Sequence, residues 1–346
     1  MKWQIDTRDC DGDSIMLNEM NNVPDAFLDA RAEELYDILK APTLFHLEGT
    51  NPKPLFICTL LHGNETTGLY AVQRLLKKYR NKPLPRAISL FIGNIAAARE
   101  NQRRLDTQDD YNRIWPGSHH SDSSEKDMMQ IVTRIMEKKK PFASIDIHNN
   151  TGKNPHYACI NILNPHGLVL ASLFSNIAVY FTDPKGVQSS AFSDFCPSVV
   201  LECGQSSDKS GEEHALSYLQ TILKMEDFSS LDSSMLKLYH TIARVTVPRT
   251  VSIGDSSDDI CLNAELEEKN FHQILPGTEF ATVNSTKEKL IIVNSESHED
   301  VTAEYMETTD TKIVFKKPVT LSMFTTSERA IRQDCVCYFM EELRVG

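Results

Sequence analysis

The sequence predicts an α/β fold, in which a mixed, mostly parallel sheet is flanked by helices and followed by a smaller, mainly β domain. Apolar runs typical of buried strands alternate with longer segments whose apolar residues recur at helical spacing, and this alternation indicates a parallel sheet. The pattern changes after a polar, serine-rich stretch at residues 227–235, beyond which Val, Ile and Thr dominate. We therefore expect two domains, residues 1–232 and residues 233–346.

The elements of the first domain follow from the spacing of apolar residues. The predicted helices are 24–40, 67–80, 123–140 and 211–225, and the predicted strands are 54–61, 87–94, 142–149, 156–163 and 198–204. In the second helix one face carries Leu69, Val72, Leu75 and Leu76, so that face should pack on the sheet. The helix over 123–140 ends in basic residues, which the helix dipole favours.

Composition limits the partners and the compartment. The formal net charge of −12 and the pI near 5.4 argue against nucleic acid, which needs a basic face. The N-terminus lacks an apolar signal region, and no apolar stretch approaches the roughly 18 residues that span a bilayer. The 8 cysteines are scattered without a C-x-x-C pair. We expect a reduced, cytoplasmic protein that does not bind a membrane; a homo-oligomer is compatible with the sequence.

Polar side chains suited to a metal follow two of the predicted strands. His62 and Glu65 lie in "LHGNETTG", directly after the strand over 54–61, and His148 ends the strand over 142–149. Two imidazoles and one carboxylate, with water in the fourth position, form a known catalytic zinc arrangement. Each histidine taken alone is as readily a hydrogen-bonded turn residue, but their shared placement at strand ends favours a metal site.

Glu202 ends the apolar run "SVVLECG", where a buried carboxylate is costly without a partner. One interpretation is a glutamate exposed at a strand end. The functional interpretation is a general base that takes a proton from the attacking water and passes it to the leaving amine.

The stretch "RENQRRLDTQDDYNRIW", residues 99–115, sets arginines among acids with poor helical periodicity, which indicates a loop. Such a run is ordinarily a solvated charged loop. In a hydrolase site, an arginine can polarise the scissile carbonyl, and another can bind a substrate carboxylate through two hydrogen bonds.

Together these pieces resemble a known family. "HGNE", "YNRIW", "DIHNN" and "LECG" occur in the order and approximate spacing of the succinylglutamate desuccinylase/aspartoacylase family, which belongs to the zinc carboxypeptidase-like superfamily. The usual forms of these motifs are G-x-H-G-N-E, D-x-N-R-x-F, D-[IL]-H and [LI]-E-x-G. The resemblance extends into the predicted β domain through "LYHTIARVTVPR" and "NFHQILPGTEF", and so covers roughly residues 50–320.

The resemblance implies a zinc-carboxypeptidase-like fold and a zinc-dependent hydrolase that cleaves the amide bond of an N-acyl amino acid, with one Zn²⁺ per chain. By the same resemblance, His62, Glu65 and His148 hold the zinc, Glu202 is the base and proton shuttle, Arg103 (or Arg104, if the alignment slips by one) polarises the carbonyl, and Asn112 and Arg113 bind the α-carboxylate.

Of two departures from the family pattern, the second bears on the substrate. Trp115 replaces the usual Phe, which is an exchange of aromatic residues. Aspartoacylases also carry an arginine about ten residues before the catalytic glutamate, whereas no basic residue stands here between Lys185 and Glu202. A less acidic acyl group or a peptide-like substrate is therefore favoured over acetylaspartate and succinylglutamate.

Two alternatives remain open from the sequence: a metallocarboxypeptidase that acts on small peptides, and a catalytically silent member that binds a metal or ligand. Other polar residues are weaker candidates for a site. We expect a solvated loop at His119 and His120 and structural roles for His156 and His166, and Cys335 and Cys337 have the wrong spacing for a common zinc knuckle.

Overall fold

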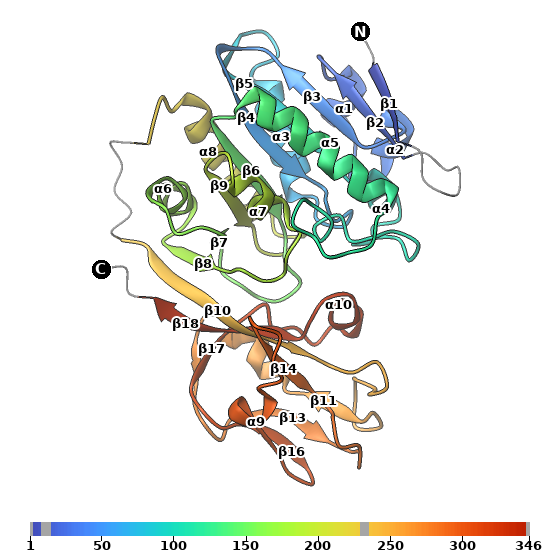
Figure 1. The fold of residues 1–346 in the computed structure, drawn as a ribbon, viewed down its shortest axis with the longest axis vertical. Coiled ribbons are helices and arrows are strands. Elements are labelled where there is room, and N and C mark those ends of the chain that lie inside the picture. The colour runs from blue at the N-terminus through green and yellow to red at the C-terminus, as the bar shows by residue number, and fades with distance from the viewer. Residues whose placement is uncertain (1–2, 8–14, 229–234, 344–346) are drawn as a thin grey trace. The chain divides into compact units, whose positions relative to one another are not determined.

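The computed structural model describes residues 3–7, 15–228 and 235–343. The fold is α/β, as the sequence predicts, with a large mixed, mostly parallel sheet and a small C-terminal antiparallel sheet of four strands (Figure 1). The chain divides into two compact units. Unit 1 comprises Met1–Asn149, His156–Ala178 and Pro184–Leu236, and unit 2 comprises Asn150–Pro155, Val179–Asp183 and Lys237–Gly346. The predicted boundary between residues 232 and 233 lies outside the described residues.

The sheet of unit 1 has four parallel strands at its centre. In spatial order its strands are β1 (Trp3–Thr7), β2 (Ile15–Met20), β3 (Thr43–Leu47), β5 (Leu84–Ile92), β4 (Gly49–Thr59), β6 (Ala143–His148), β9 (Ser198–Glu202), β7 (Tyr157–Ile160) and β8 (Ile177–Tyr180), of which only Ile177 and Ala178 belong to unit 1. Strands β5, β4, β6 and β9 are parallel, whereas β3 and β7 join them antiparallel. The carboxyl ends of the central strands therefore meet at one edge, where α/β proteins bind their ligands.

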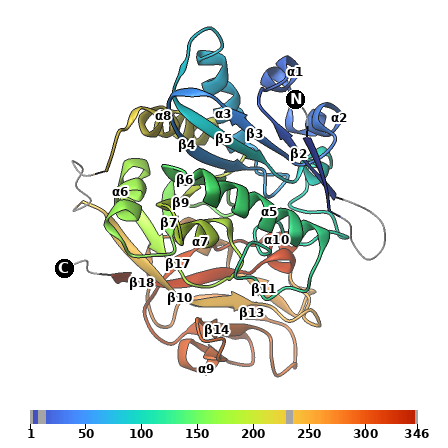
Figure 2. The same cartoon turned by 45° about the horizontal axis from the view of Figure 1, so that its top comes forward.

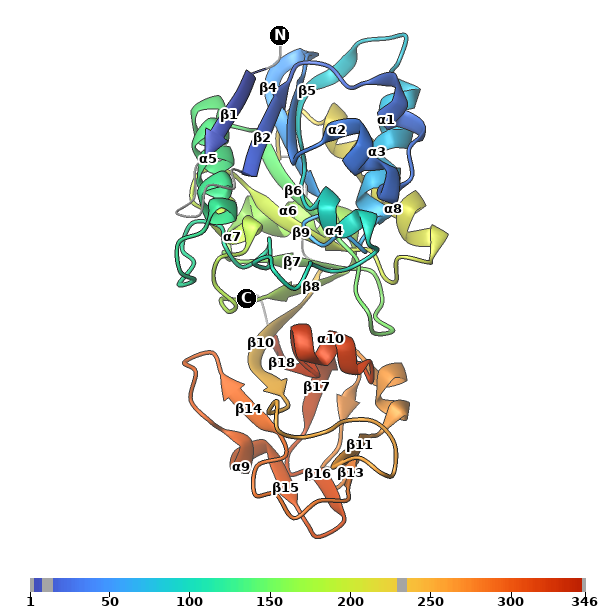
Figure 3. The ribbon, with the colours of Figure 1, turned by 90° about the vertical axis from the view of Figure 1, so that its right-hand side faces the viewer.

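Helices cover both faces of this sheet. The longer ones are α3 (Thr67–Lys78), α5 (Ser124–Lys139), α6 (Pro165–Phe174) and α8 (Lys209–Lys224), and the shorter ones are α4 (Ile95–Arg99) and α7 (Gln188–Ser193). Helices α5 and α7 lie on one face, and α3 and α8 lie on the other (Figure 2 and Figure 3). The four apolar residues that the sequence assigns to the inner face of α3 are all buried.

The segment over 24–40, which the sequence predicts as one helix, is broken. Helix α1 (Asp25–Asp29) ends at Ala30, and a 3₁₀ turn (Ala32–Glu34) and α2 (Leu35–Leu39) follow. Ala30 and Arg31 have extended backbones, with ψ of 141° and 160°. At the break, the backbone carbonyls of Phe27 and Ala30 accept hydrogen bonds from a side chain. The donor is the buried side-chain amide of Gln73, at 2.7 and 2.8 Å.

Unit 2 is mainly β. In one group of strands, β14 (Ile292–Ser295) and β18 (Cys337–Leu343) flank β10 (Lys237–Thr246), and β17 (Val319–Ser322) and β12 (Gln273–Ile274) follow β18. The four-stranded sheet has the order β11 (Ile260–Leu262), β13 (Glu279–Val283), β16 (Lys312–Phe315), β15 (Met306–Thr308). The unit also contains two short α-helices, α9 (Thr302–Tyr305) and α10 (Glu328–Gln333), and a 3₁₀ helix (Ala264–Lys269). Its core includes the fully buried rings of Phe280, Phe315, Phe324 and Phe339.

The cysteines of the described residues are all free thiols, and most of them are buried; Cys10 lies outside those residues. None of the helices that the structure describes has the length and apolarity needed to span a bilayer.

Candidate metal centre

The site begins where β4 ends, at a bend in the backbone. Leu60 is fully buried and has a left-handed backbone with φ of 56°, a conformation that costs a residue with a side chain about 1–2 kcal/mol. The family motif has glycine at this position, and glycine adopts such a backbone freely. Three residues after Leu60, Gly63 passes so close to α4 that an added Cβ would lie 2.1 Å from the backbone nitrogen of Ala98. The bend directs His62 away from the strand.

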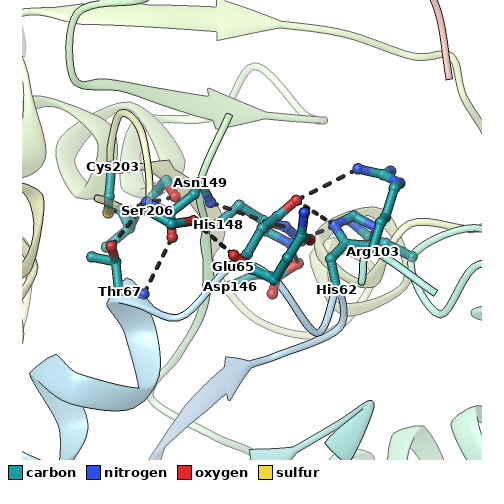
Figure 4. A network of polar contacts seen from close by, with 12 residues as sticks. His62, Glu65, Thr67, Arg103, Asp146, His148, Asn149, Cys203 and Ser206 are labelled. Atoms are coloured by element: carbon teal, nitrogen blue, oxygen red, sulfur yellow. Dashed lines mark hydrogen bonds and ion pairs between the residues drawn. The ribbon is translucent and has the colours of Figure 1, made fainter. Parts of the chain in front are cut away.

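His62, Glu65 and His148 converge on one point, as Figure 4 shows. The Nδ1 atom of His62 lies 2.8 Å from one carboxylate oxygen of Glu65, and the Nδ1 atom of His148 lies 2.7 Å from the other. One ligand atom from each residue lies within 4.8 Å of the other two, and all three side chains are buried. Within the described residues, no other group of histidine, cysteine or acidic side chains is clustered in this way.

A second carboxylate stands behind each histidine. The Nε2 atom of His62 lies 2.9 Å from Oδ1 of Asp110, and the Nε2 atom of His148 lies 2.9 Å from Oδ2 of Asp146. Asp146 is fully buried, two residues before His148 on β6. A carboxylate on the outer ring nitrogen fixes the tautomer and orientation of a metal-binding histidine and makes it a better ligand. The Nδ1 atoms of His62 and His148 are thereby directed to the carboxylate of Glu65, which lies between them.

The electrostatics of the cluster favour a cation. Burial opposes ionisation of Glu65, but the neighbouring imidazoles of His62 and His148 hold its pKa below the usual range. Burial also opposes protonation of His148, yet the carboxylates of Asp146 and Glu65 raise its pKa well above the ordinary value. The same carboxylates that attract a proton to this position would attract a metal ion.

The residues present fit zinc. Two imidazole nitrogens and one carboxylate oxygen make up a common catalytic zinc site with an open fourth position, and the acids behind both imidazoles complete the second layer of such sites. His62, Glu65 and His148 would hold the ion, while Asp110 and Asp146 would orient the two histidines.

Glu202 lies beside this cluster. It is the last residue of β9, and its Cα is paired with that of His148 in β6 and with that of Tyr157 in β7. Its side chain is buried, with 6 % of the residue exposed, so the carboxylate is not the solvent-exposed strand end that one reading of the sequence allows.

The structure places Arg103 and Arg104 differently. The guanidinium of Arg103 contacts Asp110 at 3.0 Å and lies 3.5 Å from Glu65. The backbone carbonyl of Arg103 accepts a hydrogen bond from the backbone N–H of Gly63 at 3.1 Å. Arg104 instead donates to the backbone carbonyl of Gln108 at 2.9 Å. Of the two arginines, Arg103 is therefore the one at the cluster.

Asn112 and Arg113 follow in the same loop. The Asn112 side chain lies 3.3 Å from Nε2 of His148, and its oxygen accepts a hydrogen bond from the backbone of Gln188, the first residue of α7, at 2.9 Å. The half-buried Arg113 donates to the carbonyl of Asn112 at 2.8 Å. Its charge is also one of those that hold the pKa of Asp110 well below the usual range, although burial opposes this shift and Arg103 contributes more.

The weaker candidates lie elsewhere. His119 and His120 are exposed in a loop, His166 is exposed on α6, and His156 packs against the ring of His214. Sequence reasoning assigned no role to Asp110 and Asp146, although each is the first residue of a quoted motif, D-x-N-R-x-F and D-[IL]-H, two residues before a predicted site residue. An aspartate inside the apolar strand "ASIDIH" was the available signal.

Comparisons with known proteins identify a matching family model and similar folds. The family model described as the succinylglutamate desuccinylase/aspartoacylase catalytic domain matches residues 52–228. No curated protein sequence gives a significant match. Among solved structures, the succinylglutamate desuccinylase from Chromobacterium violaceum is 16% identical, with 86% of each chain covered and a TM-score of 0.59.

Two further solved structures are similar. Murine aminoacylase 3 is 16% identical, with 86% of this chain and 98% of that chain covered and a TM-score of 0.59. The product-bound ectoine utilization protein EutE (DoeB) from Ruegeria pomeroyi is 13% identical, with 99% of this chain and 93% of that chain covered and a TM-score of 0.56. At these identities the likeness establishes the fold.

Proposed function

The chain belongs to the succinylglutamate desuccinylase/aspartoacylase family, a family of metallohydrolases acting on amide bonds, and on this premise we propose that it hydrolyses the amide bond of an N-acyl amino acid with the help of zinc. The observation that carries the proposal is the convergence of His62, Glu65 and His148, with an aspartate behind each imidazole. An aspartate on the outer nitrogen of both histidines is typical of a metal site rather than of a polar turn.

A bound zinc ion would supply a Lewis acid for the carbonyl and for the attacking water. Glu202 takes the proton from that water and delivers it to the nitrogen of the leaving amine. The guanidinium of Arg103 stabilises the charge that develops on the carbonyl oxygen. Burial of Glu202 and its pairing with His148 support this assignment, since a general base must stand close to the reacting centre.

The loop after Arg103 supplies the substrate contacts in this proposal. Asn112 and Arg113 bind the α-carboxylate of the amino acid, which arginine does best through two parallel hydrogen bonds. The segment from Gly186 to Leu201 includes α7 and most of β9 and carries no basic residue. We therefore assign a neutral acyl group and a neutral side chain, or a short peptide, to the remainder of the substrate.

An activity screen tests the proposal. The zinc-loaded protein is assayed with N-acetyl and longer N-acyl amino acids, with acetylaspartate and succinylglutamate, and with dipeptides, and the zinc-stripped protein serves as the control. We expect hydrolysis of neutral N-acyl amino acids and no higher kcat/KM for acetylaspartate; only a preference above about tenfold, or about 1.4 kcal/mol, would count against a neutral substrate.

Three other outcomes of the screen are informative. A larger preference for acetylaspartate or succinylglutamate would contradict the assignment of a neutral substrate. Faster cleavage of dipeptides would identify a carboxypeptidase, and no hydrolysis of any compound by a zinc-loaded protein would contradict the proposed function.

A further inference from the structure

We infer that Asn149 is a positioning residue, which holds the proposed metal ligand Glu65 and the end of strand β9 in one fixed geometry. Asn149 follows His148 directly, is 5 % exposed and lies in the network of Figure 4. No role in the proposed reaction accounts for it. The inference rests on the metal site of the proposed function, but not on the identity of the substrate.

The first group that Asn149 holds is the Glu65 loop. Its backbone N–H donates to Oε2 of Glu65 at 3.2 Å, the same oxygen that faces His148. Its side-chain oxygen accepts the backbone N–H of Thr67, the first residue of α3, at 3.2 Å. The side-chain amide in turn donates to the hydroxyl of Thr67 at 2.9 Å. The backbone of Asn149 thus contacts the carboxylate of Glu65, as any residue here would, whereas its side chain fixes the chain two residues beyond Glu65.

The second group is the turn after β9. The pairing of β6 with β9 continues to a hydrogen bond from the backbone of Cys203 to the carbonyl of His148, at 3.0 Å. Gly204 then turns the chain with a left-handed φ of 72°. At this turn the side-chain amide of Asn149 donates to the carbonyl of Gly204 at 2.9 Å. The side chain of Asn149 therefore adds one more hydrogen bond between the two chain segments, just beyond the point where the backbone pairing of β6 and β9 ends.

The chemistry of the asparagine side chain is specific to this task. Its oxygen meets a backbone N–H and its amide meets a backbone carbonyl, so the partners themselves determine which way the group points. Both amide hydrogens and the oxygen are used in a buried position, where a lost hydrogen bond leaves an unsatisfied group. Partners that bond a metal ligand directly commonly contribute about tenfold to a hundredfold to metal affinity or activity, and the side chain of Asn149, one step further from the ligands, should lie at the lower end of that range.

The test compares Asn149→Ala with Asn164→Ala. The control also removes an asparagine oxygen that accepts a backbone N–H at the start of a helix, since Asn164 caps α6 through Gly167. Zinc affinity is measured by competition with a chelator, thermal unfolding is measured without metal, and kcat and KM are measured on the zinc-loaded proteins. Thr67→Val, which removes only the hydroxyl that Asn149 contacts, is a milder second variant.

Asn149→Ala keeps the backbone N–H that contacts Glu65 and loses the side-chain bonds to Thr67 and Gly204. We therefore expect it to weaken zinc binding by about tenfold and to lower kcat with little change in KM. Thr67→Val should produce a smaller change in the same direction, and the double variant should lose less than the sum because the two residues share a contact. Asn164→Ala should lower the Tm alone. Should Asn149→Ala fail to fold, zinc affinity and kcat of Thr67→Val decide the question.

The inference is overturned if Asn149→Ala keeps zinc affinity and kcat within about threefold of the wild type while its Tm falls as in Asn164→Ala, since the expected effect exceeds this margin. If Asn149→Ala does not fold, the inference is overturned when Thr67→Val leaves both zinc affinity and kcat unchanged. Zinc affinity requires no substrate. A wild-type protein that binds zinc but hydrolyses no N-acyl amino acid would therefore contradict the proposed function and leave the inference about Asn149 to be decided by its own measurement.

Discussion

His148 and Glu202 are paired across two parallel strands, at the last position of each. Side chains in register on neighbouring strands point to the same face of a sheet, so the proposed ligand and the proposed base share one face and one edge. The pairing is held by the backbone, through the hydrogen bond from Cys203 to the carbonyl of His148. Replacing either side chain should therefore leave the other in place, which makes single substitutions interpretable.

Replacing either proposed imidazole ligand should lower the zinc content. His62→Ala or His148→Ala leaves two ligands where the intact site has three, so we expect less than one zinc per chain with the fold largely retained. Zinc is measured by atomic absorption after dialysis. His166→Ala, an exposed histidine on α6, is the matched control and should keep its zinc. A double variant of His62 and His148 that remained fully loaded would exclude this site.

The proposed base should be separable from the ligands. Glu202→Gln retains the size of the side chain but cannot accept a proton from water, so we expect zinc content near that of the wild type with most of the turnover lost. Atomic absorption and steady-state kinetics on the same preparation measure both quantities. If kcat stayed close to the wild-type value, Glu202 would have a structural role.

The two arginines should affect different kinetic constants. Arg113→Ala removes a charge-assisted contact with the substrate carboxylate, worth about 1.5–3 kcal/mol, and should raise KM about tenfold to a hundredfold for every N-acyl amino acid. Arg103→Ala should lower kcat instead, because its charge matters most when the carbonyl oxygen becomes an oxyanion. Arg104→Ala is the control and should change neither constant. An unchanged kcat in Arg103→Ala would refute its role.

The aspartates behind the histidines should contribute to metal affinity. Asp146→Asn keeps the shape of a fully buried side chain that contacts Nε2 of His148, but loses the carboxylate. We expect zinc affinity to fall about tenfold to a hundredfold, as measured by chelator competition, and a similar fall for Asp110→Asn. Asp127→Asn on the exposed face of α5 should have no effect. Wild-type affinity in both buried variants would show that these acids serve packing alone.

His46 should make the folding stability of the protein depend on pH. Burial and the nearby charge of Lys139 lower its pKa, and they outweigh Glu19, which lies 2.9 Å from Nε2. Below the ordinary pKa of about 6.5 the unfolded chain binds this proton more readily than the folded one, so stability should fall as the pH drops through that value. The loss ends once the pH is below the lowered pKa of the folded state.

Urea unfolding of the metal-free protein between about pH 5 and pH 8 measures this dependence. His46→Gln should show a smaller decline in unfolding free energy towards acid than the wild type, whereas His166→Gln should match the wild type. An equal decline in His46→Gln and wild type would assign the pH dependence to other groups.

The sequence predicts the location of the site better than its construction. His62, Glu65 and His148 stand at the ends of apolar runs, and the geometry of parallel strands brings such ends together. The role of Asp146 depends instead on its contact with the Nε2 atom of His148, and a contact between two side chains cannot be read from the spacing of residues in the sequence. For the same reason the sequence favours Arg103 over Arg104 only through its resemblance to the family motif, whereas the structure separates them by their contacts.

In the fold, too, some elements could be predicted from the sequence and others could not. Helix α3 follows from its apolar face because its 12 residues span about three full turns. Helix α7 has only 6 residues, too few for a period to be read, and it went unpredicted although its first backbone N–H holds the side chain of Asn112. The break after Asp29 could not be seen either, since the apolar spacing of 24–40 continues through it.

Because of the bend at Leu60, we expect that neither glycine nor a β-branched residue at this position would make the protein more stable. A change to glycine would relieve the left-handed backbone and regain about 1–2 kcal/mol, but it would also remove a fully buried leucine side chain, a loss of about 2–5 kcal/mol when the cavity cannot collapse. A β-branched residue would fill part of the space and increase the strain. Leu60→Gly alone, although it restores the glycine of the family motif, should therefore make the protein less stable. Neighbouring side chains would first have to change so that they fill the space of the leucine.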